Sequence, residues 1–170
     1  MAGFTAIICK NEFIPENIKF SEKNKYGHKN DFITNAISAD KFKIEQYTNQ
    51  KFLNDKTFLE DEQLIIGMEG VILNLKYLAE LTGKSKVFEI VKEIYLSNKD
   101  NFMSLLKGEF AGFIYSKVDD SWLIFTNQTG SKRLFYFENL DYFIFASELR
   151  DISYLLHQLK IPVKLDLRAD

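Results

Sequence analysis

Cysteine and histidine, which often act as nucleophiles, general bases or metal ligands, are rare in this 170-residue sequence. The chain has one cysteine, Cys9, and two histidines, His28 and His157, which lie far apart in the sequence. Cys9 ends the apolar run FTAIIC, so we expect a buried strand thiol, and a single cysteine excludes an intramolecular disulfide. His28 lies among lysines and asparagines and is expected to be solvated. We therefore predict no metal site and no cofactor.

Two other groups of residues resemble reactive motifs. Gly130, Lys132 and Arg133 could suggest a phosphate loop, but their spacing does not match G-x-x-x-x-G-K-[ST] and no helix follows. We predict a turn between strands there instead. Ser147 and Glu148 look like a catalytic pair, yet no general base accompanies them, so we predict no catalysis from this pair alone.

The strongest structural pattern extends from Gly108 to Glu148. Four apolar, aromatic-rich runs are separated there by turn-forming clusters at residues 119–120, 127–132 and 138–141. This alternation of apolar runs and turns is typical of consecutive antiparallel strands, so we predict a sheet over this stretch. Trp122 lies in the second run and is expected in the core.

The first part of the chain adds further strands. The short apolar run Gly3–Cys9 predicts a buried central strand. Residues 11–30, which contain polar residues and a proline, predict strand fragments and loop. Residues 32–48 predict two strands and residues 63–68 a further one. The charged and polar residues 49–62 are expected to form a surface loop.

Two or three helices are predicted between the two groups of strands. Apolar positions from Val71 to Leu81 recur at mixed spacings of two, three and four before Gly83, which suits a helix end. Residues 87–95 form an apolar stripe with charged residues on the other side, as in an amphipathic helix. Asp100 is the predicted N-cap of a short third helix, which ends before Gly108.

The composition limits the class of protein. Apolar residues make up 46% of the chain, with 16 Phe and 8 Tyr, which predicts one domain over residues 1–170 with an aromatic core. The formal charge of −2 comes from 22 basic and 24 acidic residues that are interspersed, so we expect neither a nucleic-acid partner nor a membrane partner. No apolar run approaches the roughly 18 residues that span a bilayer. We expect a cytoplasmic protein.

Four short motifs occur in the order and spacing of a known family. They are EGVILN with Gly70, Ile72 and Asn74, then LKGEFAGF, NQTGSKRLFYF, and FASE at residues 145–148. In these motifs the chain resembles the class II glutamine amidotransferase domain that begins asparagine synthetases. The resemblance extends over nearly the whole chain and is carried mainly by residues 64–156.

The resemblance implies an N-terminal-nucleophile hydrolase fold. This is an α+β, four-layer α/β/β/α sandwich of two antiparallel sheets flanked by helices. The first strand of such a fold presents the chain terminus to the site, and Gly3–Cys9 begins where that strand should. In the family, the pair that matches Ser147 and Glu148 opens a helix, with the serine as its N-cap.

The family's catalytic groups are replaced in this sequence. In the family, an N-terminal cysteine attacks the glutamine amide, and here Ala2 takes that position. Glu69 replaces the first asparagine of the family motif N-G-E-I-Y-N, which forms an oxyanion hole with the following glycine amide. Val87 aligns with the acidic residue that holds the substrate's ammonium group. The resemblance therefore implies no competent nucleophile and a vestigial substrate pocket formed by Gly3, Glu69, Gly70, Asn74 and Val87.

Three functions fit these observations. The first is a pseudoenzyme, an amidotransferase-like domain that docks onto an ATP-dependent amide-forming synthetase domain of asparagine biosynthesis, in cis or in trans. Residues 160–170 resemble the start of a linker to that domain, and no S-G-G-x-D motif is present, so we expect no ATP-dependent chemistry from this chain alone. The alternative is a glutamine-hydrolysing domain inactivated by a Cys-to-Ala change. The third is a binding domain in which Glu69 helps to hold a cationic ligand. Association of two copies as a homodimer also stays open.

Overall fold

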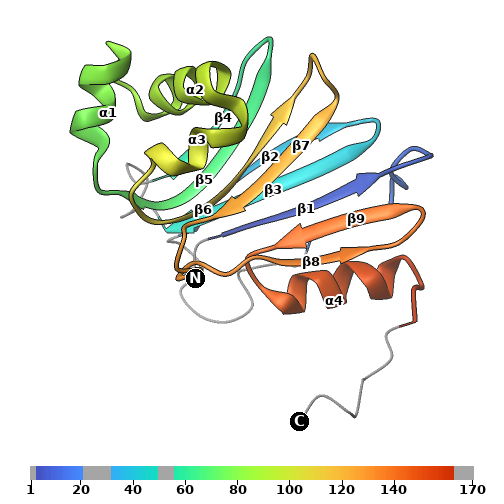
Figure 1. Ribbon diagram of the computed structural model, residues 1–170. Helices are drawn as coiled ribbons and strands as arrows, with labels where there is room; N and C mark the ends of the chain where they lie inside the picture. The colour runs from blue at the N-terminus through green and yellow to red at the C-terminus, as the bar shows by residue number, and fades with distance from the viewer. Residues whose placement is uncertain (1–2, 21–31, 50–55, 163–170) are drawn as a thin grey trace. The chain divides into compact units, whose positions relative to one another are not determined.

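The computed structural model describes residues 3–20, 32–49 and 56–162 (Figure 1). The chain divides into two compact units, which we describe separately: unit 1 contains Thr48–Leu134, and unit 2 contains Gly3–Tyr47 and Phe135–Asp170. The elements in chain order are β1 (Gly3–Cys9), β2 (Phe32–Ala39), β3 (Phe42–Asn49), β4 (Lys56–Glu60), β5 (Leu64–Ile72), α1 (Leu75–Thr82), α2 (Val87–Asn98), the 3₁₀ turn η3 (Lys99–Asn101), α3 (Phe102–Leu105), β6 (Gly108–Ser116), β7 (Ser121–Thr126), β8 (Phe135–Glu138), β9 (Tyr142–Ala146) and α4 (Leu149–Gln158).

Unit 1 is an antiparallel sheet of four strands in the order β4-β5-β6-β7, with α1, α2 and α3 on one face (Figure 1). Side chains alternate along a strand, so Ile66 and Met68 of β5 point to the helices together with Phe110 and Ile114 of β6. Burial of each such aliphatic or aromatic side chain, relative to leaving it exposed to water, contributes about 1.5–3 kcal/mol to the free energy of folding. The helix-facing core therefore holds the sheet and the helices together.

The helices of unit 1 follow the predicted pattern closely. α2 buries Ile90, Val91 and Ile94 against the sheet, as its apolar stripe predicts. α1 begins only at Leu75, because residues up to 72 continue β5, and it ends at Gly83 in the left-handed conformation. The predicted cap of α3 is wrong. The helix begins at Phe102 after the 3₁₀ turn, and its N-cap position is Asn101, which makes no side-chain capping hydrogen bond.

Unit 2 is an antiparallel sheet of five strands in the order β2-β3-β1-β9-β8. The predicted central strand is confirmed, since β1 pairs with β3 on one side and β9 on the other, and all but one of its residues are buried. α4 packs against β8 and β9 (Figure 1), and its buried residues include Ile152, Leu155 and Leu156.

Cys9 is buried as predicted, with 3% of its surface exposed, and burial together with the charges of Glu12 and Asp141 raises the pKa of its thiol.

The stretch from Gly108 to Glu148 contains the four predicted strands, but they do not form one sheet. β6 and β7 form a hairpin at the edge of the unit 1 sheet, whereas β8 and β9 form a hairpin in the sheet of unit 2. Trp122 of β7 is only partly buried, and its ring stacks on Tyr115 of β6 at a centroid distance of 4.5 Å. The prediction was therefore right for the four strands and for both hairpins, and wrong only in placing all four strands in one sheet.

One strand contradicts the predicted surface loop over residues 49–62. β4 pairs antiparallel with β5, with Phe58 opposite Gly67. The ring of Phe58 packs edge-on against Phe113 at 6.3 Å between centroids. Apart from this loop, the α+β class with two antiparallel sheets and flanking helices is confirmed.

Candidate functional site

The C-terminal end of β5 has an unusual backbone at Gly70. Its φ of +114° lies in a region that disfavours residues with a Cβ atom, and a Cβ atom added there would overlap the carbonyl oxygen of Glu109. Gly70 stays paired with Phe110 of β6, so the two strands approach closely at this point. The glycine is therefore required by the fold of unit 1, whatever chemistry the site performs.

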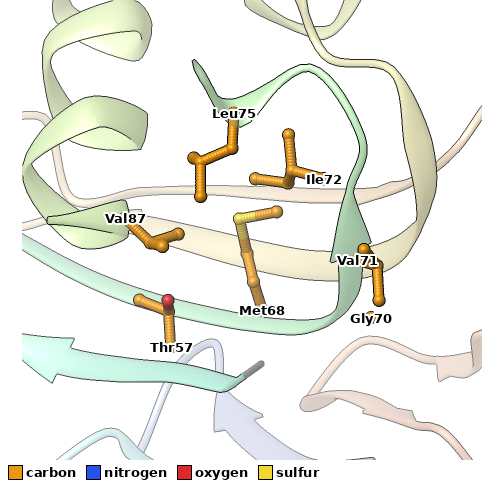
Figure 2. Close-up of a pocket in the computed structure, with 7 residues that line it drawn as sticks. All are labelled: Thr57, Met68, Gly70, Val71, Ile72, Leu75 and Val87. Carbon is orange, nitrogen blue, oxygen red and sulfur yellow. The ribbon is translucent and has the colours of Figure 1, made fainter. Parts of the chain in front are cut away.

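A pocket with a volume of about 90 Å³ opens at this end of β5 (Figure 2). β5 contributes Met68, Gly70, Val71 and Ile72, while Leu75 comes from the first turn of α1 and Val87 from the first turn of α2. The only hydroxyl among the lining side chains belongs to Thr57 of β4. The pocket is lined by Thr57, Met68, Gly70, Val71, Ile72, Leu75 and Val87.

None of these lining side chains carries a charge, so the pocket suits an apolar group. Gly70 and Val87, which the sequence assigns to the substrate pocket, do line the same pocket. Val71 stands at the third position of the segment EGVILN, where the family motif N-G-E-I-Y-N has glutamate. Two positions at which the resemblance places acids are thus valines on the pocket wall. An ammonium group entering here would find no carboxylate among the lining residues.

Glu69 lies next to this pocket in sequence but does not line it. Successive residues of a strand point to opposite faces, so its side chain leaves the sheet on the face opposite to Met68. The carboxylate is buried, with 6% of the residue exposed, and lies 3.4 Å from the ammonium group of Lys132. An ionised carboxylate only accepts hydrogen bonds, so Glu69 offers no donor to an oxyanion.

Asn74 uses its side-chain amide to join two segments of unit 1. Its Nδ2 donates to the carbonyl of Leu105 at 2.8 Å, and its Oδ1 accepts from the backbone N–H of Lys107 at 2.9 Å. Both ends of the amide are thus engaged at the connection between α3 and β6. Asn74 does not line the pocket and positions the turn that leads from β5 into α1.

The remaining predicted site residues fall elsewhere. Ala2 lies outside the described residues. Gly3 begins β1 in unit 2, where it packs against Ser147 and Tyr47 and leaves no room for a larger side chain. The predicted N-cap role of Ser147 is wrong, because the N-cap of α4 is Glu148 and the Ser147 hydroxyl instead accepts the backbone N–H of Phe4 at 3.1 Å.

A buried polar cluster lies close to the start of β1 in unit 2. The hydroxyl of Thr5 donates to the Asp151 carboxylate at 3.1 Å, and the hydroxyl of Tyr47 lies 3.4 Å from the same oxygen. All three residues are about 1% exposed. The cluster connects β1, β3 and α4, and sequence reasoning missed it because its members are 146 and 104 positions apart.

Other kinds of site find little support in the part of the chain that the structure describes. No group of three or more His, Cys, Asp or Glu side chains there could hold a metal ion. No helix in the described ranges is long and apolar enough to cross a bilayer. The turn that contains Gly130 is confirmed as a turn, in which the Gly130 N–H donates to the carbonyl of Asn127.

Sequence reasoning missed several residues at the end of β5. Thr57 was missed because β4 was predicted to be loop. Lys132 belongs to the motif NQTGSKRLFYF and was assigned to a turn, without its pairing to Glu69. Met68 and Leu75 were predicted as apolar residues of a strand and a helix, without a part in the pocket. Only the three-dimensional arrangement of β4, β5, α1 and α2 brings Thr57, Met68 and Leu75 to one pocket.

Comparison with known proteins agrees with this fold. A family model described as a glutamine amidotransferase domain matches residues 48–154, which is more than half of the chain. The glutamine phosphoribosylpyrophosphate amidotransferase from B. subtilis, solved in complex with ADP and GMP, has a similar structure with a TM-score of 0.56 and 15% sequence identity. The likeness covers 90% of this chain but only 37% of that enzyme, and it shows the fold. No curated protein matches significantly. The chain belongs to the glutamine amidotransferase domain family, of class II and of the N-terminal-nucleophile hydrolase fold.

Proposed function

We propose that this chain is an amidotransferase domain of the asparagine-synthetase type that does not hydrolyse glutamine. Its role is to dock, in the cytoplasm, onto an ATP-dependent amide-forming synthetase domain in the same or another polypeptide. The family membership supports the amidotransferase fold. The residues that stand at the family's catalytic positions support the loss of glutamine hydrolysis.

The buried carboxylate of Glu69 carries this proposal. Hydrolysis of an amide passes through a tetrahedral oxyanion, which needs hydrogen-bond donors aimed at it. At the motif position where the family has the side-chain amide of asparagine, this chain has Glu69. Its carboxylate is a hydrogen-bond acceptor and lies 3.4 Å from the ammonium group of Lys132. A negative charge beside a developing oxyanion raises the barrier to reaction rather than lowering it.

Two further replacements agree with this interpretation. Ala2 occupies the sequence position of the nucleophile, and a methyl group cannot attack an amide. Val87 lines an apolar pocket, where the resemblance places the acid that holds the ammonium group of glutamine. The nucleophile, the oxyanion donor and the substrate anchor are therefore all replaced.

Glutaminase assays on restored variants test the loss of catalysis. We expect no glutamate or ammonia from the natural chain or from Ala2→Cys, and measurable turnover only when Glu69→Asn and Val87→Asp are added. Mass spectrometry should verify that the initiator methionine is removed from the Ala2→Cys variants, so that the introduced cysteine is N-terminal. Glu109→Asn is the matched control for Glu69→Asn, because Glu109 is an exposed carboxylate on the neighbouring strand. Robust turnover by Ala2→Cys alone, in a folded protein, would overturn the proposal.

Docking is tested by sedimentation of the chain with an ATP-dependent asparagine-synthetase-type domain from the same source. A complex of defined stoichiometry is the expected result. Failure to associate, with both proteins folded, would contradict the docking role while leaving the loss of catalysis standing.

A further inference from the structure

We propose that the pocket at the end of β5 binds one branched aliphatic side chain, of the leucine or isoleucine type, presented on the neutral backbone of a partner polypeptide. This inference rests on the proposed docking function and names the kind of group that the partner inserts.

The chemistry of the wall selects an apolar occupant. Of the seven lining residues, only Thr57 has a hydroxyl and none has a charge. Figure 2 shows Met68 between Val87 and Ile72, with Leu75 nearby and the Thr57 side chain below Val87. Burying a polar group on such a wall without a hydrogen-bond partner is unfavourable. An aliphatic group carries no such cost and gains by leaving water.

The size of the pocket limits the occupant to about one short side chain. An engineered apolar cavity of about 150 Å³ accommodates benzene, which has six carbon atoms. By proportion, the volume of about 90 Å³ found here corresponds to roughly four carbon atoms. An isobutyl or sec-butyl group has this size.

The charges around the pocket favour a peptide over a free amino acid. A free amino acid would bring an ammonium group and a carboxylate, for which the lining offers no charged partner. Charged residues adjoin the lining in sequence, but Glu69 leaves the sheet on the opposite face and is paired with Lys132, and neither Lys76 nor Lys86 lines the pocket. Peptide groups are neutral, so a side chain within a polypeptide matches the uncharged wall.

Exposed apolar side chains follow the pocket residues along the chain, interspersed with the exposed charged residues Lys76 and Glu80. Val71 is 49% exposed and Leu73, immediately before α1, is 75% exposed. Tyr77 and Leu81 are 57% and 56% exposed, and they lie one helical turn apart on α1. A pocket that takes one anchor residue beside exposed apolar side chains is the arrangement of a protein-binding hot spot.

Methyl NMR with a defined probe tests the inference. The probe is N-acetyl-leucine N-methylamide, compared with the serine analogue and with free glutamine. We expect saturable shifts of the Val87, Ile72 and Leu75 methyl signals with the leucine probe only. The methyl signals of Leu155, which is buried in α4 of unit 2, should not move.

Two variants of the pocket sharpen the test. Val87→Asp should weaken binding of the leucine probe about tenfold or more, because a charge on the wall must lose its hydration. An aspartate in the first turn of α2 is compatible with the helix, so the variant should fold. Val87→Leu should also weaken binding by filling the pocket. Val118→Asp makes the same change at a valine that is 75% exposed and should leave binding unchanged.

The outcomes separate this inference from the proposed function. No saturable shift in a folded protein, or equal shifts with the serine probe, would overturn the aliphatic pocket even if the chain lacks glutaminase activity. Equal binding by Val87→Asp and Val118→Asp would also overturn it. Robust turnover by Ala2→Cys would instead refute the proposed loss of catalysis, whatever the probe does.

Discussion

The hydroxyl of Thr5 on β1 donates to the carboxylate of Asp151 on α4 at 3.1 Å, inside unit 2 and almost fully shielded from water. These residues are separated by 146 positions in sequence. The contact fixes α4 onto the strand that begins the described part of the chain. A buried polar contact of this kind is costly to break, since the groups left behind lose both their partner and water.

Replacement of Asp151 should therefore destabilise the protein. We expect Asp151→Ala to lower the free energy of unfolding by about 3 kcal/mol, because the hydroxyls of Thr5 and Tyr47 lose a buried acceptor. Asp151→Asn keeps one acceptor oxygen and should lower the free energy of unfolding by less. Urea unfolding measures the change. Asp40→Ala alters an exposed aspartate of unit 2 and should have little effect, and an equal loss in both variants would refute the role of the cluster.

Substitution of Gly70 should separate steric overlap from backbone strain. Gly83→Ala places a methyl group in open space at a φ of +67°. It should lower the free energy of unfolding by about 1 kcal/mol. Gly70→Ala also forces the methyl group against the Glu109 carbonyl, and should cost about 3 kcal/mol or more. Thermal and urea unfolding of both variants check this order. Equal losses would mean that β5 and β6 can separate at Gly70 without strain.

Acid should weaken the contact between α2 and the turn that follows β4. Burial alone would raise the pKa of Asp61, but hydrogen bonds from Lys92 at 2.6 Å and from the N–H groups of Leu64 and Gln63 at 2.8 Å, with the charge of Lys92, lower it. A carboxyl whose pKa is lower in the folded than in the unfolded state stabilises the fold above its unfolded pKa. This contribution is lost as the pH falls through the lower, folded value.

Urea unfolding between about pH 2 and pH 5 measures this effect. Asp61→Asn should make unfolding less dependent on pH over this range. Glu62→Gln changes an exposed neighbouring acid and should leave the dependence close to that of the natural chain. A natural chain whose acid dependence matches that of Asp61→Asn would contradict the lowered pKa.

Patterns that depend on neighbouring residues were predictable from the sequence. The apolar run Gly3–Cys9 gave a buried strand, and the stripe of α2 gave a helix with the right buried face. The end of α1 at Gly83 follows from the need for a left-handed residue there. In each case the residues that decide the structure lie within one or two turns or pleats of each other.

Features that depend on distant residues were not predictable in this way. β4 is an edge strand that pairs with β5 in the described part of the sheet, and its sequence KTFLE has no clear apolar alternation, so it looked like loop. The separation of β7 from β8 depends on which sheet each hairpin joins, which no local pattern encodes. For the same reason the sequence placed Gly70 and Val87 near one site but did not identify Thr57 or Met68 beside them.

The arrangement of the two units along the chain constrains how the protein is made. β1 pairs with β9 from Thr5↔Ala146 to Cys9↔Tyr142, so the central strand of unit 2 is synthesised well before this partner. All of Thr48–Leu134, which forms unit 1, emerges from the ribosome between them. During translation unit 1 can fold while β1 still has one unpaired edge, and an unpaired strand edge is a site for aggregation. The slow step in biogenesis should therefore be the late capture of β1 by the β8–β9 hairpin, a closure across more than 130 residues.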